Sequence, residues 1–196
     1  MWSSEVTEMI IRGIGESLYM TIGATVFGYL LGLPAGILLA VTDKDGIHPN
    51  AAVYKVLDVI VNILRSIPFL ILLILLIPFT RAIVGKSYGP TATIVPLVIA
   101  AAPFIARMVE SSLKEVDAGV VEAARSMGAD NFTIITKVLL VEARTSLVVG
   151  STIALGTILG YSAMAGSVGG GGLGDIAIRY GYHRYETDIM AVTVIL

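Results

Sequence analysis

The sequence predicts an all-α membrane protein, a polytopic helix bundle with about five transmembrane helices in a single domain over residues 1–196. The chain is 56% hydrophobic and only 14% charged, whereas about 25% of the residues in a soluble domain are charged. Uncharged stretches of about 20 residues, the length needed to cross a bilayer, recur along it. The formal net charge of −2 gives no sign of nucleic-acid binding, and the absence of Cys excludes disulfides and thiolate metal sites.

Four stretches are long and apolar enough to be spans: Ser17–Thr42, Val56–Thr80, Ser87–Ala106 and Ser146–Ala165. The second must accommodate Asp58 and Arg65 near one end. Residues 1–16 lack the basic region and cleavage site of a signal peptide, so we expect the first span to be retained. Residues 189–196 are apolar but too short to cross. This favours a fifth span that is incomplete in this chain over a short interfacial tail.

Lys and Arg residues predict the orientation, because they are enriched in short cytoplasmic loops. The two sides of the predicted bundle carry seven and five of them, and the segment 107–145 between the third and fourth spans holds five: Arg107, Lys114, Arg125, Lys137 and Arg144. We therefore expect this segment in the cytoplasm, the N-terminus outside and the glycine-rich end of the fourth span facing outward.

Small residues follow one another at four-residue spacing along the first span: Ala24, Gly28, Gly32, Gly36 and Ala40. They share one helix face, and small residues allow another membrane helix to approach closely. The pattern predicts a packing face, with the partner helix either in the same chain or in a second copy. Pro34 is compatible with a helix inside a membrane.

The segment 107–145 predicts two short helices. Asp117 is expected to cap a helix that runs to Met127, with Gly128 just past its end, and Asp130 is expected to cap a second helix over 131–140. Apolar residues recur at helical spacing on both: Val120, Ala124, Met127, Phe132, Ile135 and Val138 or Leu139. Such a stripe is typical either of a hairpin packed under its own bundle or of a helix presented to a soluble partner.

The same segment resembles the EAA loop of permeases in binding-protein-dependent ABC importers. The resemblance rests on Glu122-Ala123-Ala124, on Gly128 and on Val138-Leu139-Leu140, all at the family's spacing. Val138 replaces the family's Ile and Val141 its Pro, and Asp117 and Asn131 stand where close relatives often have Pro.

Further segments are similar to those of methionine-importing permeases in that family: residues 65–69, 77–81, 101–107 and 160–164, followed by the glycine-rich run 169–174. The resemblance implies a homodimer in the bacterial inner membrane, bound by two copies of a cytoplasmic ABC ATPase subunit. An extracytoplasmic binding protein would deliver an amino acid, methionine in this branch. Other amino acids or small solutes are the alternative substrates.

The resemblance also implies roles for this chain's residues. It assigns ATPase coupling to Glu122, Ala123, Ala124, Arg125, Ser126, Met127, Gly128 and Ala129. ATP and Mg²⁺ are expected on the partner ATPase, and no cofactor on this chain, which contains no Gly-x-x-x-x-Gly-Lys-Ser/Thr motif. The chain is thus expected to be a transport subunit, not an enzyme.

The substrate pathway has only positional candidates: Arg65, Met108, Tyr161, Ser162 and Met164. Each has a simpler interpretation, since Arg65 can extend its charge to the membrane interface and the others can serve packing. Arg107 and Glu110 are expected to form an i,i+3 ion pair with a structural role. The glycine-rich run 169–174 is interpreted as a flexible external gate, a contact for the binding protein or a plain loop.

Three other classes are weaker. An intramembrane serine protease would use Ser162, in Gly-x-Ser-x, with His183, but His183 lies in a polar segment. A metal enzyme would have only His48 and His183, which are predicted on opposite sides of the membrane. A channel would need rings of polar residues along a pore, and no such register occurs.

Overall fold

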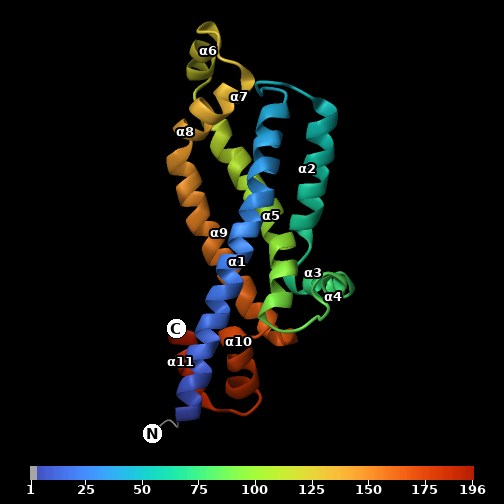
Figure 1. Cartoon of the computed structure of the whole chain (residues 1–196), viewed down its shortest axis with the longest axis vertical. Helices are drawn as coiled ribbons and strands as arrows, with labels where there is room; N and C mark the ends of the chain where they lie inside the picture. Colours follow the sequence, from blue (N-terminus) through green and yellow to red (C-terminus); the bar gives the residue numbers. More distant parts are fainter. Residues whose placement is uncertain (1–3) are drawn as a thin grey trace. The chain divides into compact units, whose positions relative to one another are not determined.

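The computed structural model describes residues 4–196, which form helices joined by turns and contain no strand (Figure 1). The predicted all-α class is confirmed. The chain divides into two compact units. One comprises the residues up to Val26, Ile67–Ala100 and Leu155–Leu196, and the other comprises Phe27–Ser66 and Ala101–Ala154. The three longest helices contribute residues to both units.

Among the described residues 4–196, three segments are long and apolar enough to cross a membrane: Ser4–Thr42, Pro90–Lys114 and Arg144–Tyr182. The first two are the helices α1 and α5, and the third begins with α9 (Arg144–Ala165). The spans predicted at these three places are therefore confirmed, although α1 and α5 extend beyond the predicted bounds. A bent pair of helices makes a fourth candidate span.

The second predicted span, Val56–Thr80, is wrong as one continuous helix. Helix α2 (Ala51–Ser66) ends before Pro68, and α3 (Phe69–Leu75) continues at an angle of 102° to it. Pro68 lacks a backbone N–H and disfavours helical geometry at the residue before it, so the chain turns here. The helix α4 (Ile77–Val84) follows and ends at Gly85, which has a φ of +81°.

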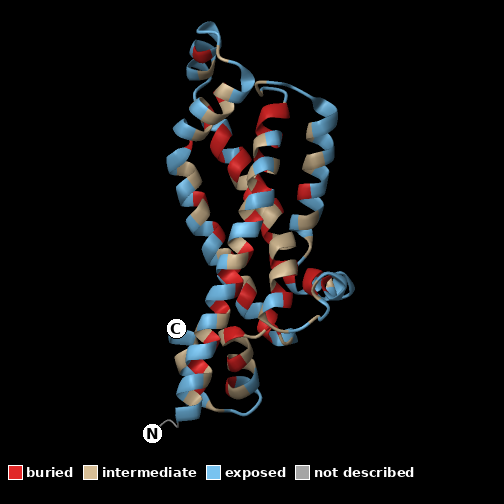
Figure 2. Cartoon of the chain, viewed as in Figure 1, coloured by how far each residue is buried: buried red, intermediate tan, exposed pale blue. Residues whose placement is uncertain are grey.

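In the unit with Phe27–Ser66, α1 packs closely against α5 through its small residues. A Cβ on Gly32 would lie 2.7 Å from the carbonyl oxygen of Ala102, and one on Gly36 would lie 2.5 Å from that of Ala106. Any larger residue would push the two backbones apart. Figure 2 shows buried residues along both helices, and a cluster of Leu39, Val61 and Ala106 closes this core against α2.

The same unit contains the short helices of the segment between α5 and α9: α6 (Ala118–Ser126), α7 (Asn131–Thr133), the π-helical η1 (Ile134–Leu139) and α8 (Leu140–Glu142). The last three of these elements, α7, η1 and α8, follow one another directly and form one helical stretch, as the sequence predicts for 131–140. The helix α5 continues to Lys114, so its last two turns lie inside the segment expected to be a loop.

The other unit contains the glycine-rich segment. After α9 come η2 (Gly166–Val168), α10 (Gly172–Ile176), the π-helical η3 (Ala177–Tyr182) and α11 (Thr187–Ile195). The glycine-rich run breaks the helix that follows α9, because Gly169 and Gly171 have positive φ values of 79° and 87°. The helix over 172–182 was not predicted.

Side chains from α1 explain that unexpected helix. The Glu16 carboxylate accepts a hydrogen bond from the Gly172 N–H, and the Ser17 hydroxyl oxygen accepts one from the Leu173 N–H, each at 2.9 Å. These bonds satisfy amides at the start of α10 that have no partner within a helix. The cap is 156 residues away along the chain, which hides it from local sequence patterns.

Candidate functional site

The helix α6 begins and ends where its sequence signals lie. The Asp117 carboxylate accepts a hydrogen bond from the Gly119 N–H at 2.7 Å and caps the first turn. At the other end Gly128 adopts a φ of +86°, and its N–H donates to the carbonyl oxygen of Arg125 at 2.9 Å. The N–H of Ala129 donates to the carbonyl oxygen of Ala124 at 3.1 Å. Both predicted caps are present, so α6 is a well-defined helix with a sharp end.

A second cap starts the helical stretch that follows. The Asp130 carboxylate accepts a hydrogen bond from the Thr133 N–H at 3.1 Å. Hydrogen bonds from the side chain and the backbone of Thr133 hold the pKa of the Asp130 carboxyl below its ordinary value. Downstream, Ile134 and Leu139 are buried and anchor this stretch in its unit.

The predicted apolar stripe divides between the inside and the surface. Ala124 is buried, but the side chains of Met127 and Phe132 are 82% and 73% exposed, and Val120 is also exposed. Exposed apolar residues beside a capped helix are typical of a contact surface for another molecule. The arrangement therefore favours a helix presented to a partner over a hairpin packed entirely under its own bundle.

The loop between α1 and α2 is attached to α6. The guanidinium of Arg125 donates a hydrogen bond to the carbonyl oxygen of Ile47. A cavity of about 420 Å³ lies between the two segments, and Asp43, Lys114 and Glu122 contribute to its lining. Of the residues predicted to couple to an ATPase, Glu122 and Arg125 thus face this cavity, whereas Met127 points to solvent.

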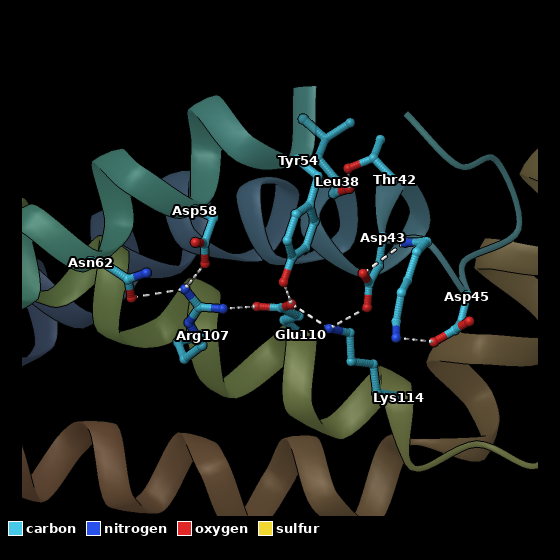
Figure 3. A network of polar contacts seen from close by, with 11 residues as sticks. Leu38, Thr42, Asp43, Asp45, Tyr54, Asp58, Asn62, Arg107, Glu110 and Lys114 are labelled. Atoms are coloured by element: carbon cyan, nitrogen blue, oxygen red, sulfur yellow. Dashed lines mark hydrogen bonds and ion pairs between the residues drawn. The ribbon is translucent and has the colours of Figure 1, made fainter. Parts of the chain in front are cut away.

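A network of charged and polar side chains connects α1, α2 and α5 next to this cavity (Figure 3). Its centre is Glu110, which is 2% exposed. The Arg107 guanidinium lies 2.6 Å from one carboxylate oxygen of Glu110, and the Lys114 ammonium lies 2.7 Å from the other. The Tyr54 hydroxyl of α2 also donates to Glu110, at 3.1 Å. The predicted Arg107–Glu110 pair is therefore confirmed as part of a larger arrangement.

The two cations extend the network to further residues. Arg107 also donates to Asp58 at 2.5 Å and to Asn62 at 3.0 Å, both on α2. Lys114 also pairs with Asp43, which follows the last residue of α1, at 2.6 Å. The hydrogen bond from Lys114 lowers the pKa of the Asp43 carboxyl. Within the whole network, only the pairs inside α5, Arg107–Glu110 at i,i+3 and Glu110–Lys114 at i,i+4, have a spacing that the sequence reveals.

The candidate pathway residues lie in separate surroundings. In one unit, Arg65 is exposed in the last turn of α2, and Met108 packs against Gly150 of α9. In the other unit, the Tyr161 ring stacks on that of Phe69 with centroids 4.6 Å apart. Ser162 is buried and Met164 is half exposed. Tyr161 and Ser162 thus have evident packing roles.

The geometry around Ser162 does not support a protease. Its hydroxyl donates to the carbonyl oxygen of Leu159 at 2.7 Å, whereas a nucleophilic Ser is hydrogen-bonded to its base. His183 is exposed, and its ring forms a T-shaped contact with that of Tyr182. Within residues 4–196, no group of three or more His, Cys, Asp or Glu side chains is placed to hold a metal ion.

Comparison with known proteins decides the family. A family model described as "Binding-protein-dependent transport system inner membrane component" matches residues 32–196. The chain belongs to this family. The resemblance seen in the EAA loop is thereby confirmed, and the chain is an inner membrane permease component, not an enzyme.

Relatives in the family are similar over most of the chain. The probable D-methionine transport system permease protein MetI of Vibrio cholerae is 50% identical over 195 residues, which are 100% of this chain and 87% of that protein. The D-methionine transport system permease protein MetI of Escherichia coli K12 is 54% identical over 158 residues, 81% of this chain and 73% of that protein.

Solved structures agree with this membership. A chain of the MetNI methionine ABC transporter in an inward-facing conformation has a TM-score of 0.97 and 50% identity, with 99% of this chain and 90% of that chain covered. An amino acid ABC transporter crystallised with histidines has a TM-score of 0.76 at 23% identity, with 97% and 88% covered, and shares the fold.

Proposed function

We propose that this chain is the membrane-spanning permease of an ATP-driven importer of methionine. It works as a homodimer with two cytoplasmic ABC ATPase subunits and an extracytoplasmic binding protein, and the ATPases hold the ATP and Mg²⁺. The main support is the 50% identity over the whole chain to a protein named as a D-methionine permease. The TM-score of 0.97 to a chain of the MetNI methionine transporter supports the same assignment.

The helix α6 is the ATPase-coupling element in this proposal. It is capped at both ends, and Met127 at its end and Phe132 in the following helix have exposed apolar side chains. Amphipathic helices bind grooves of soluble proteins through such anchors. The segment from Glu122 to Ala129 therefore docks in a cleft of the ATPase, on the cytoplasmic side.

ATP drives the cycle by differential affinity. Nucleotide binding draws the two ATPases together, α6 of each permease moves with its ATPase, and the bundle changes from inward-open to outward-open. A ligand shifts such an equilibrium only as far as it binds one state better than the other. The closed pair of ATPases must therefore bind the permease more tightly with α6 in its outward-open positions than in its inward-open positions.

Other amino acids are the alternative substrates, because the binding protein contributes much of the selection in this family. The assignment is tested by the ATPase rate of the reconstituted complex with its binding protein. We expect methionine-loaded binding protein to stimulate hydrolysis, and a binding protein loaded with another amino acid to leave the basal rate unchanged. Equal stimulation by several amino acids would retain the importer class and remove methionine as the assigned substrate.

A further inference from the structure

The carboxylate of Glu110 is buried at 2% exposure and has three donors, on two helices. Burial of a charge is costly, and a pair of buried charges is frequently no more stabilising than apolar residues of the same volume. The value of this network is therefore its geometry. Tyr54 ties Glu110 to α2, and Arg107 and Lys114 tie it to two turns of α5 (Figure 3).

Lys114 places this network directly beside the coupling segment. It is the last residue of α5, and Asp117, three residues later, caps α6. Lys114 also pairs with Asp43 at the end of α1, and Arg125 of α6 is bound to Ile47 in the loop that follows Asp43. A movement of α6 therefore acts on the end of α5 and on the α1–α2 loop at the same time.

We propose that Glu110 is a positioning residue for the transport cycle. Its buried carboxylate holds Arg107 and Lys114 in place. These two cations pair with Asp58 of α2 and with Asp43 at the end of α1. The network thereby locks the adjoining ends of the three helices, so that a displacement of α6 moves them together. With Glu110 neutralised, the two cations are held less firmly, and α1 and α2 would follow a movement of α5 less closely. This inference rests on the proposed function, in which α6 follows the ATPase.

The variant Glu110→Gln tests the role of this carboxylate while the other ion pairs of the network remain. The network contains three carboxylates and two cations. After neutralisation of Glu110, Lys114 keeps Asp43 and Arg107 keeps Asp58, so no charge is left without a partner. The variant keeps the side-chain volume and weakens only the charged link between the two remaining pairs.

The experiment compares ATP hydrolysis and methionine uptake in proteoliposomes that contain the permease, its ATPase and its binding protein. We expect Glu110→Gln to retain ATPase association and hydrolysis, while the uptake per ATP falls roughly tenfold, within the usual range for coupling between sites. Tyr54→Phe, which removes one hydrogen bond and keeps the ring, should lower the same ratio by less. Glu5→Gln, an identical change at an exposed residue of α1, should leave it unchanged.

Two results would overturn the positioning role. Uptake per ATP at the wild-type value in Glu110→Gln would show that the lock is dispensable. Loss of ATPase association in Glu110→Gln would make Glu110 a docking determinant instead. Failure of the proposed function is distinct, because the wild-type permease itself would then neither bind the ATPase nor take up methionine.

Discussion

Arg125, in the last turn of α6, donates a hydrogen bond to the carbonyl oxygen of Ile47, which is 78 residues earlier in the chain. The contact joins the coupling helix to the loop between α1 and α2. It attaches α6 to the α1–α2 loop in addition to its covalent links to α5 and α7.

Arg125→Met should loosen that loop. A hydrogen bond from a charged, exposed donor contributes about 1 kcal/mol, so amides of the loop should exchange with solvent roughly fivefold faster. The informative amides are those of Gly46 and His48, whose N–H groups donate to carbonyls of Asp43 and Val41. Arg144→Met, at another exposed Arg, is the control. Equal exchange in both variants would show that the Arg125 contact does not hold the loop.

Met127 should lie against the ATPase in the assembled complex. The chain has no Cys, so Met127→Cys introduces a single thiol at a side chain that is 82% exposed. We expect a disulfide cross-link to a Cys placed in the ATPase cleft, measured by non-reducing electrophoresis. Tyr185→Cys, at an 83% exposed residue of the other unit, is the control and should give none. If only Tyr185→Cys cross-linked, the ATPase would contact the other unit, and the docking role of α6 would be wrong.

Gly128→Ala should destabilise the end of α6. The φ of +86° at Gly128 is unfavourable for a residue with a Cβ, at a cost of about 1 kcal/mol. We expect weaker co-purification of the ATPase, because the fraying end carries Met127. Gly156→Ala, inside α9 with open space around the added Cβ, should not affect binding. If Gly128→Ala bound the ATPase as well as the wild type does, Gly128 would not be needed for docking.

Asp43 should make the stability of its unit depend on pH. Its pKa is lowered in the folded state, chiefly by the hydrogen bond from Lys114. A lowered carboxyl pKa stabilises the fold above the unfolded value of about 3.9 and ceases to do so as the pH falls through the folded pKa. The wild type should therefore melt at a higher temperature than Asp43→Asn at pH 7, and the difference should shrink below about pH 4. A difference that grew in acid would contradict this sign.

Gly174→Ala should be the most damaging of the glycine substitutions. A Cβ there would lie 2.1 Å from the carbonyl oxygen of Ala163, which belongs to α9 and cannot give way as a flexible side chain can. We expect a loss of about 1–3 kcal/mol in the free energy of unfolding, measured in detergent. Gly160→Ala, where nothing lies within 4 Å of the added Cβ, is the matched control. Similar stability of both variants would mean that α9 and α10 separate easily.

Local signals predicted much of the fold and part of the site. Asp117 and Gly128 are residue types that favour helix ends, and they predicted the bounds of α6. Uncharged runs predicted α1, α5 and α9. The bend at Pro68 was missed because hydropathy is continuous across it, although Pro68 itself was visible. There the backbone restriction of proline prevailed over the apolar composition.

The parts that the sequence did not reveal depend on partners far apart in the chain. Glu110 meets Tyr54 across 56 residues, and Glu16 caps α10 across 156. Neither pair shares a helix, so no periodicity links its members. Asp43 and Asp58 each look like ordinary charges at span ends until the fold brings them to Lys114 and Arg107.

The central claim is tested most directly by ATP-dependent uptake of labelled methionine into proteoliposomes that contain the permease, its ATPase and its binding protein. We predict uptake that requires ATP hydrolysis and that is competed by methionine and its close analogues, but not by a panel of other amino acids. Methionine uptake that persists without ATP would contradict the account, as would ATP-driven uptake of other amino acids with none of methionine.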